Sequence, residues 1–386
     1  MKRKWYSLMD KVWRMENLEG AWRSVKSNRG SCGVDEVTVE QFESNLVNNL
    51  WELHRLLREK RYKPLPVLRV NIPKGDGRVR PLGIPAVRDR VVQQALLRVL
   101  EPIFEAKFLD CSFGFRPGRS QLDAINQVEY YRGAEGYRWV VEADIESFFD
   151  NVDHEMLLDF VNEEVSDGSV LRLIRSWLET GVSVDGVAEE THKGVPQGGP
   201  ISPFLANIFL HPFDAEMTEL GYRLVRYADD FVVMCRSEEE AVCALRDVER
   251  ILNKLGLSVN ADKTRTVELS DKDGIGFLGF RIFLEHKVPL EKSVRKFKDE
   301  VRRLTRRQQP VNVQEVVVRL NPVIRGWGNY FKHGNVNWLF GKLDSWVRMR
   351  LRSFMEKKKT PVANYRIRNA HFEALGLERL SALVGF

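Results

Sequence analysis

The stretch LVRYADDFVVMC, Leu224 to Cys235, places two adjacent carboxylates, Asp229 and Asp230, between two short apolar runs. The flanks are rich in β-branched and aromatic residues, which is typical of strands. The pair is therefore predicted at the tip of a β-hairpin. Adjacent like charges repel and raise each other's pKa unless a cation or solvent screens them. Asp is also a common turn former. This stretch alone is therefore compatible with either a solvated turn or a cation site.

The composition describes a soluble globular protein. The chain has 386 residues, of which 43% are hydrophobic and 30% charged, so two or three structural units with ordinary cores are expected. No apolar run approaches the ~18 residues of a membrane helix, and the first 20 residues contain no signal core. We therefore expect a cytoplasmic protein with no membrane partner. The four cysteines form no CxxC pair, which argues against a zinc site or a disulfide framework.

Charge is distributed unevenly along the chain. Residues 291–386 carry 21 Lys and Arg against 8 Asp and Glu, a net charge of +13. Because the whole chain has a net charge of +6, residues 1–290 have a net charge of −7. The acidic part could hold cations and the basic part phosphates, although a basic surface is often only a solvated helix face.

The pattern of apolar residues predicts an α+β fold followed by a basic helical unit. Strands are expected on both sides of the Gly75-Asp76-Gly77 turn, at Trp139 to Ala143 and on both sides of the aspartate pair. Helices are expected at 87–104, in a segment capped near Asp153, and at 238–255. From about residue 292 the pattern is wholly helical.

Asp144 ends a hydrophobic strand and supplies a third carboxylate. If that strand lies beside the Asp229–Asp230 hairpin in one sheet, three carboxylates meet at one edge. Such oxygens suit Mg²⁺, which accepts carboxylates, waters and phosphate oxygens together. Two ions about 4 Å apart can activate a 3′-hydroxyl and stabilise the leaving pyrophosphate in phosphoryl transfer. The nearby Asp150 and Asp153 are interpreted as a turn and N-cap pair.

Two further segments suit a nucleotide substrate. Lys74 and Arg80 flank the glycine-rich turn of IPKGDGRVRPLG, where a basic β-ribbon can fold over a triphosphate. The loop KGVPQGGPISP offers three glycines and Gln197, so that backbone and a side-chain amide can approach a base pair closely. Taken alone, each segment is also compatible with an ordinary basic hairpin or turn.

In order along the chain, these segments resemble the reverse transcriptase family, and within it the group II intron-encoded proteins. The resemblance covers nearly the whole chain. It is carried by NRGSCGVDEVTVEQF, IPKGDGRVRPLGIP, SFGFRPGRSQLDA, VVEADIESFFDNVDH, VPQGGPISPFLANIFL, YADD, LGLSVNADKT, IGFLGFRI and NPVIRGWGNYF. It implies a right-hand polymerase with fingers, an RRM-like palm and an all-helical thumb, the maturase X domain. The implied organisation is an N-terminal extension at 1–59 with an RT0-like loop, fingers and palm at 60–290, thumb at 291–359 and a short tail at 360–386.

The resemblance also implies roles for individual residues. Asp144, Asp229 and Asp230, with the carbonyl of Ile145, would hold two Mg²⁺ ions, with Mn²⁺ as an alternative. Lys74 and Arg80 would hold the triphosphate of a dNTP, and Gln197 would line the nucleotide site. Phe149 would lie under the sugar and reject a 2′-hydroxyl, whereas Phe148 is expected in the core. Lys263 could donate a proton to pyrophosphate, or be a plain surface lysine.

The basic helices would follow a duplex of RNA template and DNA primer. Trp327 and Phe331 of NPVIRGWGNYF are expected in the helical core, which leaves Arg325 and Lys332 as RNA-binding candidates. Group II intron RNA and a DNA target are the other expected partners. With about 30 residues after the thumb and no HNH-like cysteine pairs, we expect no cleavage of DNA by this chain alone.

Three alternatives to an intron-encoded polymerase remain. One is an intron-like reverse transcriptase recruited to defence or DNA repair. The second is an RNA-binding splicing factor with little polymerase activity, which the intact carboxylates and basic hairpin oppose. The third is an RNA-dependent RNA polymerase, which Phe149 opposes. The loop at 28–38 either grips a template or covers the fingers, and the sequence does not decide between these.

Overall fold

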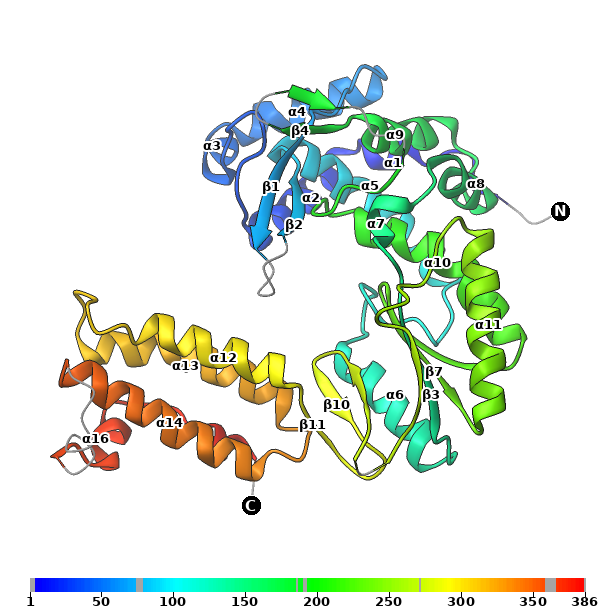
Figure 1. Ribbon diagram of the computed structural model, residues 1–386. Helices are drawn as coiled ribbons and strands as arrows, with labels where there is room; N and C mark the ends of the chain where they lie inside the picture. Colours follow the sequence, from blue (N-terminus) through cyan, green and yellow to red (C-terminus); the bar gives the residue numbers. More distant parts are fainter. Residues whose placement is uncertain are drawn as a thin grey trace. The chain divides into compact units, whose positions relative to one another are not determined.

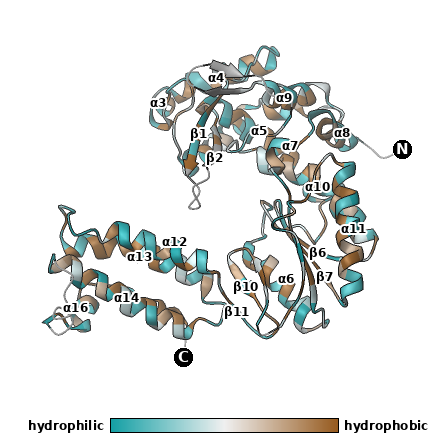
Figure 2. Cartoon of the chain, in the orientation of Figure 1, coloured by the Kyte–Doolittle hydropathy of each residue, from teal (hydrophilic) through white to brown (hydrophobic). Residues whose placement is uncertain are grey.

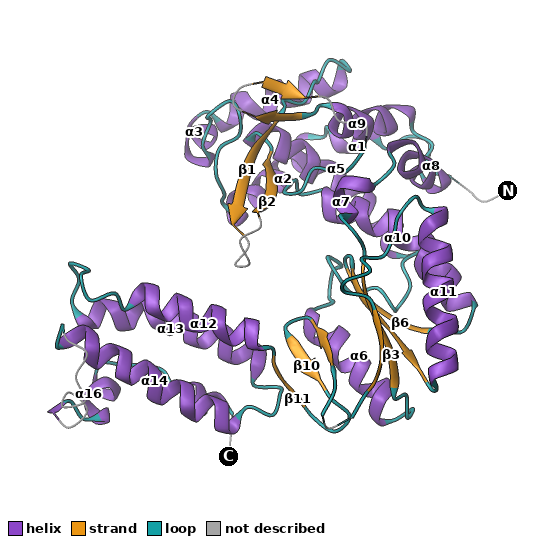
Figure 3. Ribbon diagram, viewed as in Figure 1, coloured by secondary structure: helices purple, strands orange, loops and turns teal. Residues whose placement is uncertain are grey.

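The computed structural model describes residues 4–73, 79–184, 187–189, 193–270, 272–357 and 366–384. The chain folds into two compact units that mix helices and strands (Figure 3). The N-terminal unit comprises Met1–Tyr137 and Val141–Thr266, and the C-terminal unit comprises Arg138–Val140 and Val267–Phe386.

The N-terminal unit begins with helices that pack around one long buried helix. These are α1 (Met9–Val12), α2 (Met15–Asn28), α3 (Val39–Ser44), α4 (Leu46–Arg58) and α5 (Val87–Glu105). α5 confirms the helix expected at 87–104 and packs against α1 to α4. The Arg90 guanidinium donates hydrogen bonds to the carbonyls of Arg29 and Ser31, so the loop between α2 and α3 is tied to α5.

A first sheet contains the predicted basic hairpin. Its strands are β1 (Val67–Pro73), β2 (Val79–Ile84), β4 (Val182–Val184) and β5 (Val187–Glu189), in the order β2-β1-β4-β5. β1 and β2 pair antiparallel, as the sequence predicted, and β1 pairs with β4 in parallel. The sequence analysis missed β4 and β5 because three-residue strands carry too little pattern to be recognised.

A second sheet carries the aspartates. Its strands are β3 (Trp139–Asp144), β6 (Arg223–Tyr227), β7 (Asp230–Cys235) and β8 (Arg265–Glu268), in the order β6-β7-β3-β8. Helices α6 (Gln121–Gly133), α10 (Ser202–Glu219) and α11 (Glu238–Lys254) pack against it (Figure 1). The run Phe231 to Cys235 is buried without alternation, which indicates that both faces of β7 are covered.

Three helices lie between β3 and β4 in the chain, namely α7 (Phe148–Asn151), α8 (His154–Glu164) and α9 (Gly168–Glu179). α8 begins as predicted, because the Asp153 carboxylate accepts a hydrogen bond from the Met156 amide at 3.0 Å.

The C-terminal unit combines a small sheet with helices. Strands β9 (Ile275–Phe277), β10 (Phe280–Ile282) and β11 (Lys287–Pro289) are followed by α12 (Glu291–Leu304), α13 (Val313–Phe331) and α14 (Asn337–Met355). Figure 2 shows hydrophilic and hydrophobic residues alternating along these helices, as expected for amphipathic helices. Aromatic rings from β10, α12, α13 and α14 form the core.

The small sheet packs with the helices that follow it. The rings of Phe280 and Phe331 lie 4.8 Å apart between centroids, and the Tyr330 hydroxyl donates to the Leu278 carbonyl at 2.7 Å. The small sheet therefore belongs to the same compact unit as these helices.

The described part of the C-terminal segment is folded onto α13 and α14. It contains α16 (Asn369–Ala374) and the 3₁₀-helix η1 (Leu380–Leu383). Asp344 of α14 accepts hydrogen bonds from the amides of Leu380 and Ser381 at 2.8 and 3.0 Å. A Cβ on Gly328 of α13 would lie 2.4 Å from a Leu383 methyl, so the absence of a side chain there permits the contact. This segment is thus part of the unit's core.

None of the helices in the described ranges combines the length and the apolar character that crossing a membrane requires.

Candidate active site

The aspartate pair lies where the sequence predicted it, at a tight turn between antiparallel strands. Tyr227 at the end of β6 pairs with Asp230 at the start of β7, which leaves Ala228 and Asp229 as the connecting residues. Ala228 has a φ of 59°. A left-handed conformation at a non-glycine residue costs roughly 1–2 kcal/mol, so surrounding contacts must hold the turn.

A buried arginine supplies one of those contacts. Arg226 of β6 is fully buried, and its guanidinium donates to the Ala228 carbonyl at 2.8 Å. The same group donates to the Asp214 carboxylate, with an Nε–Oδ1 distance of 2.6 Å. Its further acceptors are Asn207 Oδ1 and Ser112 Oγ. Burial alone would lower the pKa of Arg226, but the charge of Asp214 raises that pKa above its ordinary value, so the side chain stays charged.

The segment at 111–114 braces the turn from another direction. The Phe113 amide donates to the Arg226 carbonyl at 2.8 Å, and the Asn207 amide group donates to the Gly114 carbonyl at 2.7 Å. A Cβ on Gly114 would lie 2.4 Å from the Ala228 nitrogen. Only glycine therefore allows this backbone to approach the turn so closely.

Asp144 ends β3, which neighbours β7 in the sheet. Its carboxylate accepts a hydrogen bond from Lys263 Nζ at 2.6 Å. The chain brings the lysine there because the Asn260 amide donates to the Asp144 carbonyl at 2.8 Å and Ile145 forms a bridge with Val259. Lys263 is therefore beside a predicted site carboxylate, although the sequence also allowed a plain surface position.

Phe149 and Gln197 line one cavity with a volume of about 300 Å³. The loop after Lys193 is held against α7, because the Val195 amide donates to the Phe149 carbonyl at 2.7 Å. The Gln197 carbonyl accepts from the Gly83 amide at 2.6 Å, which connects the loop to β2. Phe148 is buried, as expected. The structure thus brings together two residues that were assigned to the nucleotide site from different segments.

The same cavity is lined by two cations that the sequence analysis did not single out, Arg69 of β1 and Lys193. Lys74 lies outside the described residues, and Arg80 is placed only through its backbone pairing with Ile72 in the β1–β2 hairpin.

Several other residues around the aspartate turn were also missed. Arg226 could have been noticed as a charge inside an otherwise apolar strand, since a buried charge requires a partner. Phe115 gave no comparable signal. Its ring is 54% exposed, its φ is 56°, and it lies 6.1 Å from the Tyr227 ring. An exposed aromatic in a left-handed conformation is an outlier of the kind found at functional sites.

Two cysteine thiols have a raised pKa, which lowers their reactivity. Burial, with a contribution from the charge of Asp214, raises the pKa of the Cys111 thiol to about 12. Burial likewise raises the pKa of Cys235 to about 12. Both sulfurs are therefore protonated and weakly nucleophilic at neutral pH.

The donor chemistry of the turn and of β3 suits a hard cation, because the candidate ligands are carboxylate oxygens and one backbone carbonyl. Within the described residues, no group of three or more His, Cys, Asp or Glu side chains is close enough to form a metal site. The cation that Asp144 meets in this structure is the Lys263 ammonium group.

The RNA-binding candidates of the C-terminal unit lie on α13 and just after it. The Arg325 guanidinium is exposed and forms an ion pair with Glu378, with an Nε–Oε2 distance of 3.1 Å. Lys332 Nζ donates to Asn329 Oδ1 at 3.3 Å. Phe331 is buried in the core as expected, and the partly exposed Trp327 ring packs against it with ring centroids 4.7 Å apart.

Two family descriptions match the chain. "Reverse transcriptase (RNA-dependent DNA polymerase)" matches residues 72–282, and "Group II intron, maturase-specific domain" matches residues 294–372.

Similar proteins agree with these matches. Protein YkfC of Escherichia coli (strain K12) is 35% identical over 315 residues, which cover 71% of this chain and 82% of YkfC. Group II intron-encoded protein LtrA of Lactococcus lactis subsp. cremoris is 36% identical over 209 residues, which cover 53% of this chain and 34% of LtrA. The chain therefore spans about a third of LtrA. A solved telomerase structure from Candida albicans aligns over 88% of this chain and 68% of its own, at 13% identity and a TM-score of 0.47, which supports no functional conclusion. The two domain matches and the identity to YkfC show that the chain belongs to the reverse transcriptase family, as a group II intron-type member with a maturase-specific domain.

Proposed function

We propose that this chain is an RNA-directed DNA polymerase of the group II intron type, which copies an RNA template from a DNA primer using dNTPs. In this proposal residues 1–59 are an N-terminal extension, residues 60–290 form fingers and an RRM-like palm, and residues 291–359 form the thumb. Residues 360–386 complete the thumb, since their described part packs on α13 and α14.

One observation supports the proposal most directly. Asp144 and the Asp229–Asp230 turn lie on neighbouring strands of one sheet, and separate hydrogen-bond networks position each of them. Carboxylates presented by rigid strands are the arrangement that phosphoryl transfer needs, because that chemistry depends on positioning and charge neutralisation.

Asp144, Asp229 and Asp230, with the Ile145 carbonyl, would hold two Mg²⁺ ions, or Mn²⁺ in their place. When bound, such ions supply activation of a hydroxyl nucleophile and stabilisation of charge on phosphate oxygens. The Lys263 ammonium group already lies 2.6 Å from the Asp144 carboxylate, so this position accepts positive charge.

The protein's own groups would bind and select the nucleotide. The Phe149 side chain would lie under the sugar and exclude a 2′-hydroxyl, and Gln197, which lines the same cavity, would also contact the nucleotide. Lys263 would hold a proton near the departing pyrophosphate. Lys74 and Arg80 would bind the triphosphate. This assignment rests on the sequence alone.

The second domain match and the charge of the C-terminal region support a maturase role. Residues 294–372 match the maturase-specific domain, and residues 291–386 have a net charge of +13. The expected partners are group II intron RNA, bound to assist splicing, and a DNA target for mobility. Electrostatic contacts with phosphates would supply most of the affinity.

Primer extension tests the polymerase proposal. The protein is given Mg²⁺, a DNA primer on an RNA template, and either dNTPs or NTPs, beside the variant Asp229→Ala/Asp230→Ala. A matched control is Glu238→Ala/Glu239→Ala, which removes another adjacent acidic pair, at the start of α11. Long DNA products are expected from the parent and the control, with none from the aspartate variant. A folded, RNA-binding parent that makes no product would contradict the proposal and favour an RNA-binding splicing factor.

The choice of sugar provides a second test. Phe149→Val should leave dNTP incorporation measurable and raise incorporation of NTPs, because it removes the ring that would meet a 2′-hydroxyl. An unchanged preference for dNTPs would remove Phe149 from this role.

A further inference from the structure

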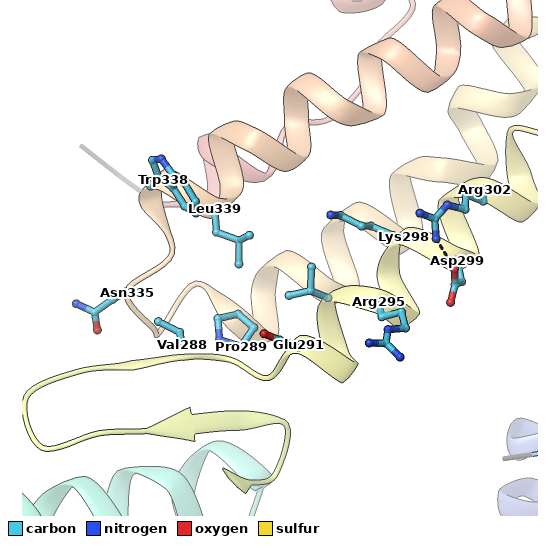
Figure 4. Close-up of a pocket in the computed structure, with 11 residues that line it drawn as sticks. Val288, Pro289, Glu291, Arg295, Lys298, Asp299, Arg302, Asn335, Trp338 and Leu339 are labelled. Carbon is cyan, nitrogen blue, oxygen red and sulfur yellow. Dashed lines mark hydrogen bonds and ion pairs between the residues drawn. The ribbon is translucent and has the colours of Figure 1, made fainter. Parts of the chain in front are cut away.

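A groove in the C-terminal unit has no part in the nucleotidyl-transfer site described above. It has a volume of about 680 Å³ and lies between the β11–α12 segment and the start of α14 (Figure 4). Its apolar floor is formed by Val288, Pro289, Val294 and Leu339. A concave apolar surface of this size is within the range of sites that bind small groups.

Cations lie along one side of the groove. Arg295, Lys298 and Arg302 follow one another at spacings of three and four residues on α12, so they share a face of that helix. Asp299 pairs with Arg302, with an Nη1–Oδ1 distance of 2.6 Å (Figure 4), and Glu291 is the other lining carboxylate. The remaining positive charge comes from Arg295 and Lys298.

Tryptophan rings of α14 lie beside cations of α12 and α14. Trp338 lines the groove and is 72% exposed, although tryptophan is highly buried on average. Lys342 Nζ lies 3.6 Å from its ring centroid. About two helical turns after Trp338 on α14, Trp346 is contacted by Lys298 and Arg302, at 5.8 and 5.7 Å from its ring centroid. The surface therefore alternates indole rings with cations.

We propose that this groove binds an unpaired nucleotide of RNA, with its base stacked on Trp338 and its phosphates beside Arg295 and Lys298. The inference rests on the proposed RNA-binding function. Base stacking on an exposed aromatic, with neighbouring cations for the phosphates, is the general chemistry by which proteins bind unpaired nucleic acid.

The shape of the surface favours an unpaired nucleotide over a duplex. A duplex keeps its base faces stacked inside and presents phosphates and groove edges. It therefore has no exposed apolar face that could fill a hollow with an apolar floor. An extruded base covers such a floor and removes apolar surface from water. The cations favour RNA over a protein partner, because each phosphate along a strand offers them a charge.

Photo-crosslinking with the full chain tests the proposal. The probe is an RNA hairpin with 5-iodouridine in its loop, compared with the same sequence fully paired in a duplex. A stacked 5-iodouridine is expected to crosslink to the tryptic peptide covering 333–342, which contains Trp338. The expected result is a crosslink with the hairpin and little with the duplex. Absence of the crosslink while the hairpin is bound, or an equal crosslink with the duplex, would overturn the proposal.

Variants separate stacking from general binding. Trp338→Ala is expected to abolish this crosslink and to weaken hairpin binding by about tenfold, as loss of one stacked base predicts. Trp338→Phe should restore binding to within about threefold, because it keeps an aromatic face. Trp51→Ala is the matched control, since Trp51 is also exposed but lies in the N-terminal unit. Its substitution should leave the crosslink unchanged, and an equal loss of hairpin binding in Trp51→Ala would contradict a specific site.

Primer extension on the same preparations distinguishes this proposal from the polymerase proposal. Trp338→Ala should extend a DNA primer annealed to a longer RNA template at the rate of the parent. An equal loss of extension and hairpin binding would place Trp338 in template–primer binding and overturn the inference. A parent that crosslinks at 333–342 but extends no primer would contradict the polymerase proposal while leaving this one intact.

Discussion

The aspartate turn of the N-terminal unit and the surface around Arg325 in the C-terminal unit use charged residues in opposite ways. Around the aspartate turn of the N-terminal unit, Arg226 is fully buried and divides its guanidinium hydrogen bonds among four residues. In the C-terminal unit, the Arg325 side chain is 58% exposed and is paired with Glu378. The first arrangement determines where a piece of backbone lies. The second contributes to a charged surface. Each ion pair on that surface adds little to stability, because solvent screens exposed charges.

This difference predicts how each unit responds to substitution. Removing one member of a buried ion pair leaves the other charge unpaired in a medium of low dielectric constant, which is strongly destabilising. Removing one member of an exposed pair leaves the other charge solvated by water, which costs little. Single substitutions of charged residues should therefore damage the aspartate turn severely and change the surface around Arg325 only in small, additive steps.

Arg226→Met should give the largest effect. It leaves the Asp214 carboxylate buried without its cation, so the free energy of unfolding should fall by about 3–5 kcal/mol, and primer extension should be lost. Urea-induced unfolding of the full chain measures the first effect. The double variant Arg226→Met/Asp214→Leu removes both charges and should recover part of the stability without recovering extension, because the Ala228 carbonyl still lacks its donor. A single variant as stable as the parent would show that the network does not hold the turn.

Gly114→Ala should separate catalysis from stability. The added Cβ would lie 2.4 Å from the Ala228 nitrogen, so the turn that carries Asp229 must move. A misplacement of about 1 Å in a catalytic group can lower a rate by ~100-fold. Steady-state extension should therefore show a much reduced kcat in protein that still binds template.

Gly133→Ala is the control for this substitution. Gly133 ends α6, and no atom lies within 4 Å of the position of an added Cβ. That variant should match the parent in rate and be equally or more stable, since alanine favours helix. Equal rates for Gly114→Ala and the parent would mean that the turn tolerates the shift.

The hairpin and the cap were accessible from the sequence because they depend on local patterns. Short apolar runs rich in β-branched and aromatic residues predicted the strands on both sides of Asp229 and Asp230, and Asp153 before an apolar helix predicted its N-cap. The bracing of the turn by Gly114 and Asn207 was not accessible. Those contacts join segments about a hundred residues apart, and the sequence around neither residue indicates which residue it contacts.

Lys263→Gln should give an intermediate effect. It removes the ammonium group 2.6 Å from the Asp144 carboxylate without disturbing a buried contact, because both side chains are partly exposed. If Lys263 balances charge or supplies a proton during turnover, kcat should fall by about tenfold or more, while the melting temperature changes little. Single-nucleotide incorporation at saturating dNTP measures this.

Arg265→Gln is the matched control for Lys263. Arg265 is also exposed and also pairs with a carboxylate of β3, Glu142, at 2.9 Å, but Glu142 is not among the proposed metal ligands. Its substitution should leave kcat within about twofold of the parent, as expected for an exposed ion pair worth less than about 1 kcal/mol. A similar loss of kcat in both variants would mean that kcat depends on positive charge near β3 and not on the contact with Asp144.

The position of Lys263 shows where sequence analysis was undecided and why. The segment NADKT gives no sign of whether its lysine faces solvent or a carboxylate. That choice is made by the pairing of residues 258–260 with residues 144–146, through the hydrogen bonds of Asn260 and Glu146. Long-range pairing of this kind cannot be read from either segment alone. By contrast, the packing of Trp327 and Phe331 followed from helical spacing, which is local.

Glu378→Gln should give the smallest effect, and in the opposite direction. Glu378 holds the Arg325 guanidinium in an exposed ion pair, so its neutralisation should cost less than about 1 kcal/mol of stability. The freed guanidinium could then neutralise one more RNA phosphate. RNA binding should become slightly tighter at low salt, and the slope of log affinity against log salt should steepen by up to about one unit. Arg325→Gln should not steepen that slope, and adding Glu378→Gln to it should produce no further gain, because the gain requires the arginine. A gain that persists in the double variant would assign the effect to the lost carboxylate itself, acting by general repulsion of RNA and not through release of Arg325.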